Sequence, residues 1–235
     1  MALALVALAL VAIAAGAAAA DPLPGIVGRD DRVPQLQAAE WPWTAIGRVN
    51  RASGGFCTGT LVAAGRVLTA AHCLWNRRSG AMLAPDRLHF VAGWRRGGYL
   101  AHATAARIVT DPGLAFDRQG RPGSAATDWA VLVLDPASKQ GDWPRPLPLA
   151  LPAAVAPGTP LSRAGYGRDR PHALSRQDGC RALGLANGGA ILLHDCDATF
   201  GDSGSPVLVG TGAGPAVAGI HIAFVEEHGT TTGAA

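Results

Sequence analysis

The stretch "DCDATFGDSGSP" (residues 195–206) decides the fold, because it sets Ser203 in a distinctive surrounding: Gly204 follows it directly, and Cys196 lies seven residues before it. A serine hydroxyl becomes a good nucleophile only when a base removes its proton. In a G-x-S-x-G elbow, the second glycine comes two residues after the serine and a helix follows. Here Gly204 is one position early and the strand-like "SPVLVG" comes next. The stretch therefore excludes an α/β-hydrolase and makes Ser203 a candidate nucleophile in a strand-rich fold.

Two further residues complete a candidate set for nucleophilic catalysis. His72 lies in "LTAAHC", and Asp128 lies in "TDWAVLVL", just before an apolar strand-like run. A serine nucleophile needs such a histidine as its base and an acid that holds the tautomer of that base. The chain order is His, Asp, Ser, whereas an α/β-hydrolase has Ser, Asp, His. Asp111 and Asp117 are alternative acids, but neither precedes a buried-looking strand, so we assign Asp128.

The composition bounds the class of protein. The chain has 235 residues, of which 49% are hydrophobic and 16% are charged, so one domain can bury a sizeable core. The 31 glycines and 17 prolines favour many turns over long helices. The net charge is only +3, and no run of Lys or Arg is longer than two residues. The sequence therefore predicts no nucleic-acid partner.

The apolar residues fall into two groups of short strand-like runs, rich in Val, Ile and Leu and broken by Gly, Pro or Asp. The first group contains "TAIGRVN", "GFCTGTLVAAGRVLTAA", "RLHFVAGW", "ARIVTD" and "WAVLVL"; the second contains "PLSRAGYG", "AILLHD", "GSPVLVG" and "AVAGIHIAFV". A proline-rich linker at about residues 141–157 separates the groups. The pattern predicts an all-β fold, arranged as paired barrels or as a sandwich.

Residues 1–20 predict a signal peptide. They are almost entirely Ala, Leu, Val and Ile, and Ala18, Ala19 and Ala20 form a small-residue cleavage site before Asp21. A membrane anchor is the alternative, because the run is about long enough to span a bilayer. No later stretch is apolar for about 18 residues. We therefore expect a secreted or periplasmic protein with no stable membrane insertion after removal of the signal.

Four cysteines, Cys57, Cys73, Cys180 and Cys196, predict two disulfides in an exported chain. Three pairings are open, and in the most local one each cysteine is bonded to a partner 16 residues away. Each local bridge would stabilise the fold by roughly 3 kcal/mol through loop closure. A metal site is the alternative, but the chain has no C-x-x-C. We expect no metal site and no cofactor.

The blocks "TAAHC", "DWAVLVL" and "GDSGSP" resemble the three signature blocks of chymotrypsin-like (trypsin-fold) serine proteases, and "AGYG" resembles the strand that enters their second barrel. The resemblance covers about residues 26–225. Within that family, "DDRVP", "WPWTAIGRV", "CDATFGDSGSP" and "GIHI" are similar to the bacterial glutamyl-endopeptidase-like branch. The resemblance implies two packed six-stranded antiparallel barrels in one domain at residues 26–235, the first at about 40–140 and the second at about 158–235.

The resemblance also implies a role for each candidate residue. Ser203 attacks the scissile carbonyl of a protein or peptide substrate, His72 transfers the proton, and Asp128 orients His72. The backbone N–H groups of Gly201 and Ser203 form an oxyanion hole. The implied disulfides are Cys57–Cys73, which holds the loop of the catalytic histidine, and Cys180–Cys196, which ties the specificity wall to the nucleophile loop.

Three residues bear on which bond is cut. Asp197 lies six residues before Ser203, where trypsin-like pockets carry the acid that selects Arg or Lys. His221 lies 18 residues after Ser203, where the glutamate-cutting enzymes place a pocket histidine that favours a carboxylate. Those enzymes usually have Ser or Thr five residues before the nucleophile, and here that residue is Ala198. Asp197 and His221 could also neutralise each other, so acidic, basic and other preferences all remain open.

The stretch "GIVGRDDR" resembles the new N-terminus of an activated protease. In such proteases, a freed Ile amino group pairs with the Asp before the catalytic serine, which here would join Ile26 to Asp202. This implies that residues 21–25 form a short pro-segment. The alternative is that "IVG" is an ordinary apolar triplet.

The C-terminal tail departs from the family pattern. The chain ends 14 residues after His221, and "VEEHGTTTGAA" is polar and small rather than strand-like. Family members usually continue with another strand behind the specificity pocket. We therefore expect the second barrel either to close differently or to be incomplete, with an exposed edge.

These residues predict a secreted serine endopeptidase, and we expect it to be a monomer. The alternatives are a pseudo-protease that binds without cutting and an esterase. Labelling of Ser203 by a fluorophosphonate would exclude the first, and turnover of esters without peptides would indicate the second. The remaining histidines lack a motif, and we expect them in the core or on the surface: His89, His102, His172, His194 and His228.

Overall fold

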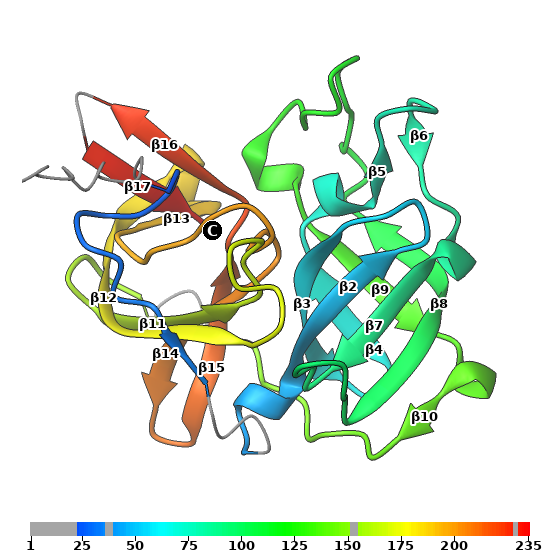
Figure 1. Ribbon diagram of the computed structural model, residues 1–235. Helices are drawn as coiled ribbons and strands as arrows, with labels where there is room; N and C mark the ends of the chain where they lie inside the picture. Colours follow the sequence, from blue (N-terminus) through cyan, green and yellow to red (C-terminus); the bar gives the residue numbers. More distant parts are fainter. Residues whose placement is uncertain (1–22, 36–39, 151–154, 228–229) are drawn as a thin grey trace, which may run out of the picture.

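The computed structural model describes residues 23–35, 40–150, 155–227 and 230–235. Two sets of antiparallel strands lie side by side, with the first set on the right of Figure 1 and the second on the left. The described residues contain strands and short 3₁₀ helices but no α-helix, which confirms the predicted all-β class. The predicted signal peptide, residues 1–20, lies outside the described residues, as do the first two residues of the predicted pro-segment.

The first set is a closed barrel of six strands. These are β2 (Ile46–Arg51), β3 (Phe56–Ala63), β4 (Arg66–Thr69), β7 (Leu88–Ala92), β8 (Ala101–Thr110) and β9 (Ala130–Leu134). Their order is β8-β7-β2-β3-β4-β9, and a pairing between β8 and β9 closes the ring. In β9, the buried Ala130, Leu132 and Leu134 alternate with partly exposed valines, which is the pattern of a strand with one face in the barrel interior.

The second set is a curled sheet. Its strands are β11 (Pro160–Gly165), β12 (Ser175–Ala186), β13 (Ile191–His194), β14 (Pro206–Thr211), β15 (Gly214–Ile220), β16 (Ala223–Glu227) and β17 (Thr230–Ala234). Their order is β15-β14-β11-β12-β13-β17-β16, and β1 (Val33–Pro34) of the N-terminal segment pairs with β12. Within the described residues no ladder joins β15 to β16, so this sheet stays open where the first barrel closes.

The polar C-terminal tail forms strands, which corrects the expectation drawn from its composition. β16 and β17 make a hairpin, and β17 pairs with β13, where Gly233 lies opposite His194. Ala235 exchanges backbone hydrogen bonds with Leu192 at 2.7 and 2.9 Å. A Cβ at Gly233 would overlap the His194 ring, so the small residues of the tail suit this contact. β17 forms because β13 supplies backbone hydrogen-bond partners. The intrinsic strand propensity of the tail residues gives no sign of a partner so far away in the sequence.

The remaining elements are short: β5 (Trp75–Asn76), β6 (Ala81–Met82), β10 (Gln140–Gly141), η1 (Trp43–Ala45), η2 (Ala71–Leu74), η3 (Pro85–Arg87), η4 (Ala125–Thr127), η5 (Pro136–Ser138) and η7 (Asn187–Gly189). β10 pairs with β8 at the margin of the first barrel. The chain then crosses to β11, and the predicted linker falls on this crossing (Figure 1). η2 and η4 lie near the junction of the two sets (Figure 1).

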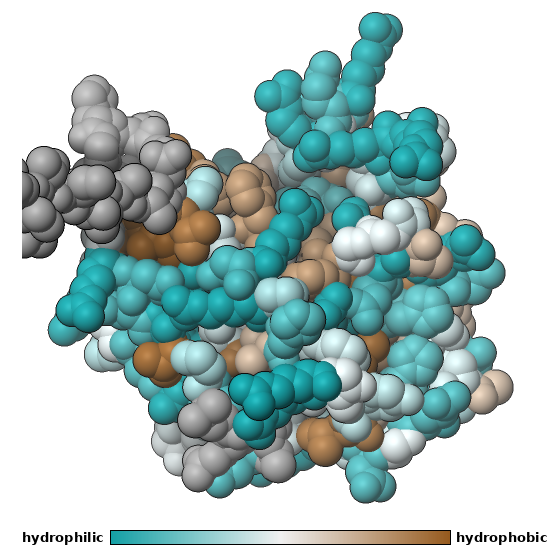
Figure 2. Space-filling model, in the orientation of Figure 1, coloured by the Kyte–Doolittle hydropathy of each residue, from teal (hydrophilic) through white to brown (hydrophobic). Residues whose placement is uncertain are grey.

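One hydrophobic core joins the two sets of strands. It contains Leu61 and Leu132 from the first barrel together with Leu208 and Val217 from the second sheet, and all four are buried. The face drawn in Figure 2 is largely hydrophilic, with apolar side chains in small separate areas. No helix in the described part of the chain is long and apolar enough to cross a membrane.

The four cysteines form the two local disulfides, as the resemblance implied. Cys57–Cys73 joins β3 to η2, and Cys180–Cys196 joins β12 to the loop after β13. The first bridge fixes η2 to the barrel wall. The second anchors the start of the loop that carries Ser203. Both bridges therefore restrain segments that hold candidate catalytic residues.

Candidate active site

His72 and Asp128 meet at one end of the first barrel. His72 belongs to η2, which follows β4, and Asp128 follows η4 shortly before β9. β4 and β9 pair with Thr69 opposite Ala130, so the residues just beyond these two positions are brought together. His72 Nδ1 lies 2.6 Å from Asp128 Oδ2, and the His72 backbone N–H donates to Asp128 Oδ1 at 2.8 Å. The two contacts fix both the position and the ring orientation of His72.

The contact of Asp128 with His72 Nδ1 decides which nitrogen of His72 is the base. Asp128 is only 3% exposed, and an ionised carboxylate can only accept hydrogen bonds. His72 must therefore carry its proton on Nδ1, which leaves Nε2 with an available lone pair. The His72 side chain is 26% exposed and lines a cleft between the two sets of strands. A proton acceptor is thus presented to the cleft.

Ser203 lines the same cleft, on the loop between β13 and β14. Its carbonyl accepts a hydrogen bond from the Thr58 N–H of β3 at 2.9 Å, and the Gly204 N–H donates to the His221 carbonyl at 2.7 Å. Gly204 has φ +81°, and a Cβ there would overlap the Thr58 carbonyl, so the close approach of the loop to the first barrel requires glycine. Among the described residues, no hydrogen bond joins the Ser203 hydroxyl to the His72 ring. Such contacts are often long before substrate binds.

The turn before Ser203 leaves two backbone donors without a protein partner. Gly201 has φ +98°, and a Cβ there would lie 2.6 Å from the Tyr166 carbonyl oxygen. Within the part of the chain that the structure describes, neither the Gly201 N–H nor the Ser203 N–H donates to a protein acceptor. Both residues line the cleft. Two unpaired N–H donors beside a candidate nucleophile suit an anionic oxygen.

The predicted pair of a freed Ile26 amino group with Asp202 concerns a chain cut after Gly25, so it stays a prediction here, where residues 25 and 26 are joined. The Ile26 N–H donates to the Leu23 carbonyl at 3.3 Å. Asp202 instead forms ion pairs with Arg163 at 2.9 Å and with Arg32 at 3.5 Å, and all three side chains are fully buried. In this uncut chain, two internal cations therefore compensate the carboxylate of Asp202.

Asp197 does not line the cleft, which corrects its assignment to the specificity pocket. The residue is fully buried, and its carboxylate accepts hydrogen bonds from the Val27 N–H at 2.7 Å and from the Asp31 N–H at 2.9 Å. Its own N–H donates to Gln177 Oε1 at 2.6 Å. Burial raises the pKa of Asp197, and the two backbone donors act in the opposite direction. Asp197 therefore fastens the N-terminal segment (residues 23–35) to the second sheet.

The cleft has a volume of about 750 Å³, and its second-sheet wall includes Thr199, His221 and Phe224. Ala198 is buried outside this lining, and its N–H donates to the Gly25 carbonyl at 2.9 Å. Of the three predicted pocket residues, only His221 therefore reaches the cleft. Thr199, one residue beyond Ala198, supplies a hydroxyl-bearing side chain to the same wall.

His194 belongs to this site, although its sequence surroundings carry no motif. It is fully buried beside His221, and its Nε2 lies 3.4 Å from His221 Nδ1. The Cys196 backbone N–H donates to His194 Nδ1 at 3.1 Å. Because this Nδ1 is an acceptor, the neutral His194 ring carries its proton on Nε2 and donates it to His221. The only signal for His194 in the sequence is its place at the end of the strand-like run "AILLHD".

Burial keeps both imidazoles neutral. It lowers the pKa of His194 to about 3, and the positive charge of Arg163 acts in the same direction. Burial also lowers the pKa of His221 well below its usual value, with further contributions from His194 and Arg163. Since His221 Nδ1 accepts from His194, the proton of the neutral His221 ring lies on Nε2. His221 is therefore a neutral N–H donor rather than a permanent cation.

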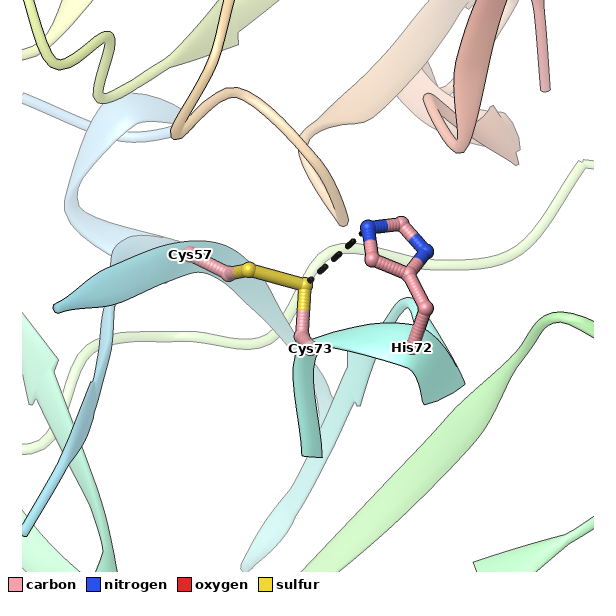
Figure 3. Close-up of side chains that lie close together, drawn as sticks. All are labelled: Cys57, His72 and Cys73. Atoms are coloured by element: carbon pink, nitrogen blue, oxygen red, sulfur yellow. Dashed lines mark hydrogen bonds between the residues drawn. A yellow bond between two sulfur atoms is a disulfide. The ribbon is translucent and has the colours of Figure 1, made fainter. Parts of the chain in front are cut away.

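Cys57, His72 and Cys73 place a ring nitrogen and two sulfur atoms within 4.8 Å of one another (Figure 3). Two thiolates and an imidazole could bind zinc. The two sulfur atoms are bonded to each other, however, so neither is a thiolate. His72 Nε2 lies 3.8 Å from Cys73 Sγ (Figure 3). The disulfide therefore packs beside the ring and restricts where His72 can move.

Comparisons with known proteins agree with this geometry. A family model described as Trypsin matches residues 32–234. The solved structure of a Glu endopeptidase is similar, with a TM-score of 0.68 at 20% identity over 89% of this chain and 92% of that chain. That of a thermostable serine protease from an extremophilic microorganism has a TM-score of 0.60 at 21% identity over 81% of this chain and 90% of that chain. A comparison with curated proteins found no match.

Proposed function

The chain belongs to the trypsin family of serine peptidases, and on this premise we propose that it is an endopeptidase with Ser203 as nucleophile, His72 as general base and Asp128 as the residue that orients His72. One observation carries the proposal. His72 Nδ1 is 2.6 Å from the buried Asp128, which leaves Nε2 as a base in the cleft that Ser203 also lines. The substrate is a protein or a peptide.

The reaction proceeds in two halves. Ser203 Oγ adds to the scissile carbonyl carbon while His72 Nε2 takes the hydroxyl proton. The imidazolium then returns that proton to the leaving amine, the C–N bond breaks, and an acyl-enzyme remains. Water attacks the acyl-enzyme with His72 again as base, and the acid product leaves. Asp128 keeps its contact with Nδ1 and stabilises the imidazolium.

The oxyanion of both tetrahedral intermediates is held by the backbone. The N–H groups of Gly201 and Ser203 lack other protein partners among the described residues and are available to it. Each such donor contributes roughly 10²–10³ in rate. The positive φ of Gly201 belongs to the same turn, so any larger residue there would disturb these donors.

For the residue before the scissile bond, we propose a preference for Glu or Asp. A substrate carboxylate would accept hydrogen bonds from His221 Nε2–H and from the Thr199 hydroxyl, and both residues line the cleft. No Asp or Glu is among the described residues of this lining. Asp197, at the spacing of a base-selecting acid, is bonded to the N-terminal segment instead. A Lys or Arg side chain would have no acidic partner, which argues against a basic preference.

We also propose that the protein acts outside the cytoplasm, in the extracellular or periplasmic space, after residues 1–20 have directed its export. Its two disulfides suit an oxidising compartment. Residues 1–20 have the composition of a signal peptide. N-terminal sequencing of the exported protein would test this, and a mature chain that still begins at Met1 would contradict it.

The test of the catalytic assignment is cleavage of a peptide library by purified protein beside Ser203→Ala. We expect cuts after Glu or Asp that vanish in the variant, and fluorophosphonate labelling of the wild type alone. If neither the wild type nor Ser203→Ala cleaves a peptide or is labelled, the proposal is contradicted and a binding module is favoured. Hydrolysis of simple esters without any peptide cleavage would favour an esterase.

A further inference from the structure

Four arginines line the active-site cleft, and within the described residues none of them forms an ion pair: Arg51, Arg77, Arg78 and Arg168. The lining contains no Asp or Glu to compensate them. Other unpaired arginines, such as Arg107, lie outside this lining. The cleft is therefore a place where four arginines share one concave surface without an acidic partner among the described residues.

Three of these arginines, Arg51, Arg77 and Arg168, form one cluster. Burial lowers the pKa of Arg51, and the neighbouring charges of Arg168 and Arg77 lower it further. The Arg51 Nε atom is also buried without a hydrogen-bond partner. A partly buried guanidinium beside two like charges opposes folding. The Arg168 guanidinium lies 5.8 Å from the centre of the Phe200 ring, and this contact does not compensate the charge of the cluster. Charged groups of this kind are typical of binding sites.

The cluster is held by the elements that build the catalytic site. Arg51 ends β2, and Arg77 follows β5, which comes directly after η2. The β2–β3 hairpin and β5 lie at the same end of the first barrel as η2 (Figure 1). The Arg168 N–H donates to the Phe200 carbonyl at 2.7 Å, and a Cβ on Gly201 would lie 3.0 Å from that Arg168 nitrogen. The backbone segments that carry Arg51, Arg77 and Arg168 thus border the cleft that Ser203 and His72 line.

We propose that Arg51, Arg77 and Arg168 bind acidic side chains of the substrate that neighbour the residue held at His221. The inference rests on the proposed function, since it concerns a peptide that lies in this cleft. Unpaired guanidinium groups present several N–H donors that match a carboxylate. Arg51 ends β2 of the first barrel and Arg77 follows β5, whereas His221 follows β15 of the second sheet. The two sites therefore recognise different residues of one acidic peptide.

Paired peptides test this recognition separately from the choice of scissile bond. Both peptides of a pair keep the same residue before the bond, and the flanking residues are Glu in one and Gln in the other. We expect Arg77→Gln and Arg168→Gln each to lower kcat/KM about fivefold on the Glu peptide and to leave it unchanged on the Gln peptide. Raising the salt concentration should reduce the difference between the peptides. Arg107→Gln, an exposed site on β8 outside the cleft lining, is the matched control and should change neither rate.

Binding to the Ser203→Ala protein provides a second readout that needs no catalysis. Fluorescence anisotropy should show tighter binding of the Glu peptide than of the Gln peptide, and the added Arg77→Gln and Arg168→Gln changes should abolish the difference. Equal binding of both peptides, or equal losses on both, would overturn the inference. If the wild type cleaves no peptide yet the arginine-dependent binding is seen, the catalytic proposal fails and the acidic binding site stands.

Discussion

Asp202 and Arg163 form an ion pair of 2.9 Å in which neither side chain is exposed to solvent. Arg32 approaches the other carboxylate oxygen at 3.5 Å, and its side chain is buried as well. Asp202 is the residue immediately before Ser203, so these contacts hold the loop on which the proposed nucleophile lies. The negative charge is compensated by Arg163 and Arg32, two internal residues of the folded chain.

This pairing predicts that activity does not depend on a new N-terminus. A protein that begins at Asp21 and one that begins at Ile26 should have the same kcat/KM within about twofold, because Asp202 has its partners in both. Proteolytic assays on the two purified forms, with masses verified, provide the measurement. An inactive Asp21 form that gains activity on trimming would show that the pro-segment hypothesis was right.

Removing one partner of the same pair should strongly destabilise the protein, because it leaves a buried charge poorly compensated. Arg163→Met leaves Asp202 with a weaker partner in a buried site, and the free energy of unfolding should fall by about 3–5 kcal/mol. Urea denaturation measures this free energy, and Arg121→Met is the control variant. Arg121 is 72% exposed and pairs with Asp117 on the surface, so its loss should cost less than about 1 kcal/mol. Similar losses in the two variants would contradict the role assigned to Arg163.

Asp128→Asn tests the base. The amide can donate to His72 Nδ1, which would move the ring proton to Nε2 and remove the acceptor for the Ser203 proton. We expect kcat to fall about 10⁴-fold, with the fold intact. Steady-state kinetics and a denaturation curve on the same sample separate the two effects. A kcat within tenfold of the wild type would exclude Asp128 as the orienting acid.

His194→Gln tests whether His194 positions His221. A glutamine amide can turn either its NH₂ group or its oxygen toward His221 Nδ1, so the His221 ring can take either tautomer. The preference for Glu over Gln before the scissile bond should then fall about tenfold through KM. Hydrolysis of a small ester with no side chain in that site should keep its kcat. His172→Gln, at an exposed histidine, is the control. Unchanged selectivity in His194→Gln would reduce His194 to a core residue.

The lowered pKa of His194 also predicts a dependence of stability on pH. The unfolded chain takes up a proton at this histidine below about pH 6.5, whereas the native ring stays neutral down to about pH 3. The unfolded state then binds more protons, so the free energy of unfolding falls as the pH falls through this window, by about 1.4 kcal/mol per unit. Urea denaturation at pH 6.5 and at pH 5 gives the free energy of unfolding at each pH. This free energy should fall less between the two pH values in His194→Gln than in the wild type. An equal fall in the two proteins would mean that the pKa of His194 is not lowered in the native state.

Local patterns predicted the strand-rich class, which the structure confirms. They also singled out His72 and Asp128, which the structure brings into contact. His72 and Asp128 each follow or precede a strand of the first barrel, so a residue's place beside an apolar run was informative. Each disulfide also joins cysteines only 16 residues apart in the sequence. In each of these cases the deciding residues lie close together in the sequence or carry a distinctive motif.

The partners of the buried acids could not be read in this way. The Asp197 carboxylate accepts a hydrogen bond from the Val27 N–H, 170 residues away in sequence, and no local signal indicates that contact. Spacing from Ser203 suggested a pocket residue, but the position of the N-terminal segment decides what Asp197 does. His194 was missed for a related reason, since its role depends on β17 and His221, which come later in the chain.

The bonds from Asp197 to Val27 and Asp31 also limit how this protease can be re-engineered. Conversion to cleavage after Lys or Arg would need an acidic side chain in the cleft. Asp197 has the expected spacing from Ser203, but its carboxylate already accepts hydrogen bonds from the N-terminal segment. Redirecting Asp197 toward substrate would release residues 23–35 from the second sheet. A successful redesign would therefore introduce its new carboxylate on the cleft wall itself, at Thr199, and leave Asp197 untouched.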